Sequence, residues 1–348
     1  MACALVPMAA GCHIKGPTTV TKDRLEYNQA IAESWKTQML LNVVKLRYGD
    51  TPVFLDVGSV TAGYASGNSY SAGIGIPLDG TNGALSLGGG GTYSNTPTIS
   101  YLPMSGERFA RSLMMPIPPT AILKVIQSGF PADLVFRLAV QSVNGVDNRS
   151  IQSNQVRPAD PEFYALLKDL RRIQTSGDFG TRVQHGDKGD QLQMVLRPKP
   201  VAALENTRVD VTKLLDLDPT AREFNVVYGT VAANDKEIAI LSRSIFEVLT
   251  DISSLIEVPQ AHVDEMRVMQ TPEPDLGPDG PIRPLMRIVS SQEKPTDAFV
   301  SAPYRGYWFS IDDKDLQSKQ LFSFLLYIFT FVEPGGTAAP PVLTIPVR

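Results

Sequence analysis

One stretch of fifty residues, 57–106, is almost free of charge in a chain where 20% of the residues are charged. At that average about ten charges would be expected, and the stretch contains one, Asp79. It also holds twelve of the 27 glycines. Gly- and Ser-rich segments of low charge are often flexible linkers. A linker has no regular order of residue types, so the order within the stretch decides what it can form.

The larger residues of this stretch recur at every second position, as they do in a β-strand whose two faces differ. They take even numbers in the first half and odd numbers in the second. Asp79-Gly80 and Asn82-Gly83, between the halves, are strong turn signals. We therefore predict an amphipathic β-hairpin over 58–106, with the larger residues on one face. The residues assigned to this face are Tyr64, Tyr70, Ile74, Ile76, Leu78, Leu85, Leu87, Tyr93, Ile99 and Tyr101.

The expected register opposes Leu78 to Leu85 and Tyr70 to Tyr93. A slip of one residue would move every apolar residue of one strand to the other face, so the agreement between the halves favours a hairpin over a linker. The residues from Tyr70 to Leu78 would span about 30 Å. Tilted by about 45°, they would cross roughly 20 Å, close to the ~25 Å apolar band of an outer-membrane barrel.

A single hairpin cannot cross a membrane, because its two edges would leave backbone groups unpaired in hydrocarbon. Several copies could cross it by donating hairpins to one closed barrel, a design that resembles curli-type secretion channels and barrel-forming toxins. Two alternatives stay open. The hairpin could pack its apolar face on the protein's own core or on a neighbouring subunit, or the stretch could be a partly disordered loop.

Both cysteines, Cys3 and Cys12, lie at the start of the sequence, so the chain from His13 onward contains none. Ala10-Gly11-Cys12 follows an apolar, uncharged run and resembles a bacterial lipobox, in which the cysteine becomes the lipidated first residue of the mature protein. The resemblance implies that residues 1–12 are the remnant of a lipoprotein signal and that Cys12 is acylated. Because His13 is not an aspartate, it also implies sorting to the outer membrane. The alternative is an apolar terminus in which the cysteine occurs by chance.

The rest of the chain is typical of an α+β fold, with a helical N-terminal half and a mixed antiparallel strand and helix C-terminal half. Within residues 13–57 we expect a tether over 13–22, a helix over 23–48 and a strand over 51–57. Residues 107–177 are expected to form a helical region. Its predicted helices are 107–114, 120–127, 131–144 and 160–174.

Residues 178–348 are predicted to form an α+β domain. A hairpin is expected around a turn at 186–189, and an antiparallel set of strands within 285–311. Five prolines in 270–284 indicate an exposed loop. The other predicted elements are strands at 223–228, 237–241 and 343–347 and helices at 243–256 and 315–332.

The sequence contains no nucleophile elbow, zinc-protease motif or phosphate-binding loop. Three histidines and two cysteines leave little material for metal sites. The net charge of -4 argues against nucleic-acid binding, since contact with phosphates needs a basic surface. We therefore expect a protein that is not an enzyme, with no catalytic residue, no metal and no cofactor.

Three groups of residues have the composition of functional sites, and a structural interpretation is favoured for each. His262 could bind a metal or act as a base, but a structural hydrogen bond or a solvated loop explains it better, since no second histidine is near. The acidic residues of 312–315 suggest a calcium loop without its glycine, and are more typical of a helix start. The aromatic residues of 304–309 could stack a sugar or a base, and alternation in a half-buried strand explains them as well.

Four segments carry a resemblance to a known family. They are YNQAI (27–31), LLNVVKLRYGDTP (40–52), PTISY (97–101) and YWFSIDD (307–313). They resemble a family of uncharacterised proteobacterial proteins that are predicted to be outer-membrane lipoproteins. The resemblance covers most of the chain and implies a Gram-negative cell envelope, and it implies no activity.

Together these observations predict a non-enzymatic outer-membrane lipoprotein, anchored by its lipid with the body in the periplasm. Copies would assemble into a ring and donate hairpins to a shared β-barrel pore or an inter-subunit sheet, as a structural component of an envelope channel or secretion system. Its partners would be other copies, outer-membrane lipid and other envelope proteins. The alternative is a monomeric, periplasm-facing binding or accessory lipoprotein of a larger envelope complex.

Overall fold

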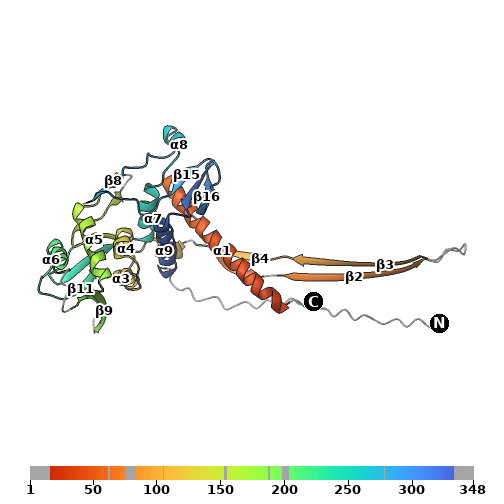
Figure 1. The fold of residues 1–348 in the computed structure, drawn as a ribbon, viewed down its shortest axis with the longest axis horizontal. Coiled ribbons are helices and arrows are strands. Elements are labelled where there is room, and N and C mark those ends of the chain that lie inside the picture. Colours follow the sequence, from red (N-terminus) through yellow and green to blue (C-terminus); the bar gives the residue numbers. More distant parts are fainter. Residues whose placement is uncertain are drawn as a thin grey trace. The chain divides into compact units, whose positions relative to one another are not determined.

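The computed structural model describes residues 16–61, 63–75, 84–104, 106–152, 155–186, 189–197, 204–277 and 279–332 (Figure 1). Its helices and small sheets form an α+β fold, as the sequence predicts. The chain divides into two compact units. Val53–Met104 is the first, which we call the ribbon, and the segments before and after it form the second, which we call the body. None of the helices in the described segments combines the length and the apolar character needed to cross a lipid bilayer.

The largest sheet of the body has six strands in the order β6-β5-β12-β11-β10-β9. Neighbouring strands are antiparallel, except that β11 and β12 are parallel. The strands are β5 (Val140–Val143), β6 (Val146–Asp147), β9 (Phe179–Gly186), β10 (Gly189–Leu196), β11 (Glu223–Tyr228) and β12 (Glu237–Ser242).

Four helices contribute apolar side chains to a core beside this sheet. They are α3 (Pro119–Gln127), α4 (Ala132–Ala139), α5 (Pro161–Thr175) and α6 (Glu205–Leu214). Leu123, Phe136, Ile173 and Val211, one from each helix, meet Phe224 of β11 around a single small apolar cavity. All five side chains are buried. Burying such side chains is the main favourable term in folding, so this core holds the sheet and the helices together.

The N-terminal helix of the body, α1 (Gly16–Arg47), contacts α7, β16 and β17. A second sheet, in the order β15-β17-β16, is antiparallel throughout. The other helices of the body and the strands of this sheet are α2 (Gly106–Met114), α7 (Ile245–Ser254), α8 (Gln260–Asp264), α9 (Leu316–Val332), β15 (Val289–Ser291), β16 (Ala298–Tyr304) and β17 (Tyr307–Asp312). Two short antiparallel pairs complete the body: β7 (Ser150–Gln152) with β8 (Gln155–Arg157), and β13 (Leu276–Gly277) with β14 (Gly280–Pro281).

Arg149, Asp178, Arg243 and Asp251 are buried charged side chains of the body, and all but Asp178 lie in one cluster. Arg243 donates to Asp251 Oδ2 at 3.2 Å and to two backbone carbonyl oxygens of α4. Arg149 Nε lies 3.7 Å from Asp251 Oδ1. One carboxylate therefore faces two guanidinium groups, and its loss would leave positive charge without compensation in the interior.

Residues 131–144 do not form the single helix that the sequence predicts. α4 ends at Ala139, and the chain continues as β5 and turns at Asn144 and Gly145, which both have positive φ. An Asn-Gly pair favours a tight hairpin turn, and this local signal outweighs the helical spacing before it. Since β5 joins strands that follow residue 178, one sheet crosses the boundary predicted after residue 177.

Other boundaries also differ. The chain is helical from Gly16, so the predicted tether does not extend over 16–22, and the strand predicted at 51–57 begins at Leu55. Helix α6 was not predicted, because its residues lack a strong apolar period. The hairpin around 186–189, the antiparallel set and the remaining helices are confirmed to within a few residues. Residues 1–15 and the strand predicted at 343–347 lie outside the described residues.

Candidate functional site

The ribbon is one long antiparallel ladder of four strands (Figure 1). β2 and β3 oppose twelve residues each, from Tyr64 opposite Asn95 to Gly75 opposite Ala84. The Thr96 amide donates a hydrogen bond of 2.9 Å to the Gly63 carbonyl oxygen, which continues the ladder toward β1 and β4. The strands are β1 (Leu55–Thr61), β2 (Tyr64–Gly75), β3 (Ala84–Asn95) and β4 (Thr98–Pro103).

The predicted register is wrong by four residues. Leu85 lies opposite Ile74 instead of Leu78, and Tyr93 lies opposite Ser66 instead of Tyr70. The described pairs extend as far as Gly75 opposite Ala84, and residues 76–83 lie outside the described residues. Because the error is an even number of residues, the assignment of residues to faces is unchanged.

A β-bulge at Gly58 keeps the same face apolar through β1. The register shifts between Val57, opposite Tyr101, and Ser59, so that Val60 lies opposite Ile99. In a regular strand Val57 and Val60, three residues apart, would lie on opposite faces, and the bulge places them on the same one. A Cβ at Gly58 would lie 2.9 Å from the Leu102 side chain, which would have to shift to admit any larger residue at the bulge.

The register gives the ribbon two unlike faces, since residues directly opposite each other share a face. One face carries every Tyr, Ile and Leu of β2 and β3: Tyr64, Tyr70, Ile74, Leu85, Leu87 and Tyr93. The other face consists of Gly, Ala, Ser and Thr alone in these two strands. We call these the large face and the small face. Ile76 and Leu78, also assigned to the large face, lie outside the described residues, as does Cys12.

On the small face, hydroxyl groups lie opposite glycines and donate to their carbonyl oxygens. The donor–acceptor pairs are Ser69–Gly90 (3.2 Å), Ser71–Gly88 (3.4 Å) and Thr92–Gly67 (3.2 Å). A Cβ on these glycines would lie 2.8–3.3 Å from the facing hydroxyl oxygen, so glycine leaves the space that each hydroxyl occupies. The hydroxyls therefore find acceptors within the ribbon.

Apolar residues at the base of the ribbon are exposed. Ile99, Tyr101 and Leu102 of β4 are 41%, 55% and 51% exposed. Within the part of the chain that the structure describes, β2 and β3 pair only with each other, so the outer edge of each strand presents unpaired backbone groups. A two-stranded ribbon is marginally stable at best by itself. The β2–β3 pair thus has two edges that no other described strand occupies.

His262 makes the structural hydrogen bond that the sequence favours. Its Nδ1 lies 2.7 Å from the Tyr48 hydroxyl, and the ring of Tyr307 meets it edge-on at 5.0 Å. Burial lowers the pKa of His262, and it raises the pKa of Tyr48 to about 12. Nearby, Asp50 accepts from Tyr304, and this hydrogen bond lowers the pKa of Asp50. These contacts join the end of α1 to α8 and to the turn between β16 and β17.

The other two groups are also structural. Asp315 Oδ1 accepts from the Ser318 amide at 3.1 Å, which caps the start of α9. Phe309 is fully buried while Tyr304, Tyr307 and Trp308 are half-buried, as expected for a strand with one face in the core. Among the described residues, no group of three or more His, Cys, Asp and Glu side chains could hold a metal ion. These positions therefore stabilise the body.

The sequence did not identify the bulge or the Gly–hydroxyl pairs, because both depend on the register. Comparison with known proteins adds no constraint: no protein family, curated protein or solved structure matches the chain. The ribbon is the candidate functional site, because its two faces differ and the outer edges of β2 and β3 are unpaired among the described strands.

Proposed function

We propose that this chain is a non-enzymatic outer-membrane lipoprotein whose copies assemble into a ring and pair their ribbons edge to edge in a shared β-barrel pore. The observation that carries the proposal is a two-faced ribbon whose long strands, β2 and β3, contain no charged residue and pair only with each other among the described strands. In a ring, β2 of one copy would lie beside β3 of the next, and every strand of the barrel would be antiparallel. Closure would then pair all the edges.

The length of the ribbon supports a membrane role. Each of β2 and β3 has 12 residues. Twelve residues extend about 40 Å, and at a tilt of about 45° they cross roughly 28 Å. The apolar band of outer-membrane barrels is about 25 Å tall. The paired part of the ribbon is therefore long enough to cross it.

The two faces suit the two environments of such a barrel. The large face, with its Tyr, Ile and Leu residues, would contact lipid, and the small face would line the lumen. A basic residue on the lipid face costs about 2–4 kcal/mol at the bilayer midplane, and β2 and β3, which contain no charged residue, avoid this cost. Acylation of Cys12, predicted from the sequence, would hold each copy at the membrane before assembly.

A second candidate is an inter-subunit sheet outside the membrane. The hydroxyls of the small face find acceptors inside the ribbon, so this face could pack dry against a sheet from another copy. The chain would still form a ring, but without a pore. A monomeric accessory lipoprotein of a larger envelope complex is the outcome if no ring forms.

The first experiment removes the paired strands and keeps the body. Because the Thr96 amide donates to Gly63 O, residues 64–95 can be replaced by an Asn-Gly turn that joins the two. We expect the full chain to migrate in detergent as a large oligomer and to conduct in planar bilayers, and the shortened chain to be a folded monomer. A full chain that is monomeric, or a shortened chain that assembles equally well, would overturn the proposal.

A second experiment compares the two faces of one strand. Ile74→Asp lies on the large face and Ser71→Asp on the small face, three residues apart. We expect Ile74→Asp to prevent insertion, and Ser71→Asp to preserve the oligomer while shifting its conductance toward cations. If Ser71→Asp instead blocks assembly and Ile74→Asp does not, the small face packs against another copy and the inter-subunit sheet is supported.

A further inference from the structure

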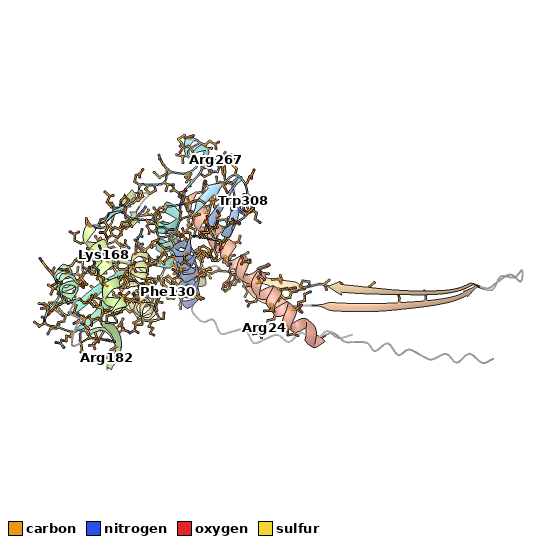
Figure 2. All side chains as sticks on the ribbon, in the orientation of Figure 1. Arg24, Phe130, Lys168, Arg182, Arg267 and Trp308 are labelled. Atoms are coloured by element: carbon orange, nitrogen blue, oxygen red, sulfur yellow. The ribbon has the colours of Figure 1, made fainter. Side chains whose placement is uncertain are left out.

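A groove runs along one face of α9 in the body. Two hollows of about 320 Å³ and 590 Å³ meet at Phe324. The first extends to Ile328 and the second to Leu316, so the groove follows one helical stripe. The opposite wall is formed by residues 115–135, and Phe130 from this wall lies beside α9 with its ring 4.8 Å from that of Phe324 (Figure 2).

The lining of this α9 groove is mostly apolar and aromatic. Phe130, Phe299 and Phe324 all line it. Leu316 and Met115, toward its two ends, are 64% and 56% exposed. Apolar surface gathered in one groove is costly to leave in water and is typical of a binding surface.

The segment that follows α9 has the composition to fill the groove. The chain leaves α9 at Val332, one turn beyond Ile328, and continues with Glu333-Pro334-Gly335-Gly336. Pro-Gly is a strong turn signal, so the chain can reverse direction there. The next residues, 337–347 (TAAPPVLTIPV), contain three prolines and no charge. Proline-rich segments dock in aromatic-lined grooves because they lose little entropy on binding.

The length also fits. Eleven residues of polyproline-like chain span about 34 Å at ~3.1 Å each. The groove from Ile328 to Leu316 is roughly 18 Å long at ~1.5 Å per helical residue. A segment that reverses after α9 can therefore follow the groove to its far end.

We propose that residues 337–347 bind the α9 groove of their own chain, extended and antiparallel to α9. The prolines pack on the aromatic lining, and the apolar residues beyond them cover Leu316. This inference concerns the body and is independent of the function proposed for the ribbon.

The test is a disulfide between the segment and the groove wall. In a full chain with Cys3→Ser and Cys12→Ser, which has no other cysteine, Leu134→Cys is combined with Leu343→Cys. Leu134 lines the groove, and Leu343 falls near it when the segment runs antiparallel to α9. The control pairs Leu343→Cys with Val231→Cys, which is 79% exposed and does not line the groove. Mild oxidation of dilute protein is followed by intact mass and non-reducing gels.

We expect an intramolecular disulfide in the first pair and none in the control. Adding Leu343→Asp and Ile345→Asp to the full chain without engineered cysteines should raise hydrogen exchange over residues 128–135, with the circular dichroism of the body unchanged. A disulfide-linked dimer would show that the segment fills the groove of a second copy and would overturn the proposal. Equal oxidation of both pairs, or exchange unaffected by the Asp substitutions, would also overturn it.

Discussion

The body buries Phe163, Phe224, Phe309 and Phe322 completely, whereas all six residues of β4 in the ribbon are exposed. In the body, helices and sheets from distant parts of the chain bury apolar side chains against one another. In the ribbon, charge is nearly absent and neither edge of the β2–β3 pair has a partner among the described strands. The body is therefore specified by contacts within one chain, and the ribbon has the features of a surface whose partners lie outside it.

The largest expected effect is that of a substitution that removes a buried contact within the body. Asp251→Asn would leave Arg149 and Arg243 buried without a carboxylate, and we expect the free energy of unfolding of the body to fall by about 3–5 kcal/mol. Urea denaturation followed by circular dichroism measures the loss. The exposed Asp210→Asn is the control and should change stability by less than about 0.5 kcal/mol. A small effect of Asp251→Asn would mean that the buried ion cluster is not a stabilising element.

A milder change tests a local element of the body. The Ser244 hydroxyl accepts from the Glu247 amide and Glu247 accepts from the Ser244 amide, so the two form a capping box at the start of α7. Ser244→Ala should lower the free energy of unfolding by about 1 kcal/mol. Ser290→Ala, which makes the same change within a strand, should cost less. Equal losses in the two variants would contradict the role of the cap.

The pH dependence of the body offers a smaller effect. Burial, with help from Arg267 and Arg305 and against Glu265, lowers the pKa of His262 in the folded state. The unfolded chain then binds more protons than the folded one, so stability is full above about pH 6.5 and declines as the pH falls through the lowered pKa. His262→Asn can still accept from Tyr48 and should flatten this decline. Melting temperatures of both proteins between about pH 7.5 and 5 measure it, and identical slopes would contradict the prediction.

A change in the ribbon should leave the stability of the body unaltered. A Cβ at Gly88 would lie 2.8 Å from Ser71 Oγ, so Gly88→Ala should weaken the β2–β3 pairing. We expect less of the proposed oligomer to survive heating in detergent. Removing the opposing hydroxyl with Ser71→Gly in the same chain should restore it. The melting of the body should be the same in all three proteins. A shift in that melting would show that the two units are energetically coupled.

Much of the fold could be predicted because its signals are local. Pro161 at the start of α5, the Gly-Asp-Lys-Gly turn at 186–189 and the period-two alternation of the ribbon each involve residues close in sequence. The faces of the ribbon were predictable for this reason. The register was not, because a shift by any even number of residues leaves the alternation of each strand and its faces unchanged.

Contacts between distant residues account for the rest. The partner of His262 is Tyr48, 214 residues away, and nothing in the sequence near either residue indicates the other. The sheet that joins β5 to β12 likewise links segments that composition alone assigns to different regions. Gly67, Gly88 and Gly90 leave room for the hydroxyl groups opposite them, and these pairs can be identified only once the register is known.

The bulge at Gly58 has a consequence for how such a ribbon can evolve. Each strand alternates faces at every residue, so an inserted or deleted residue within β2 or β3 would exchange the large and small faces beyond it. Length changes should therefore be inherited in steps of two residues, matched between the two strands. The bulge at Gly58 shows how a single extra residue can be accommodated, since Val57 and Val60 still lie on the same face on either side of it. In related chains, we expect ribbons of different lengths to differ by even numbers between this bulge and the tip.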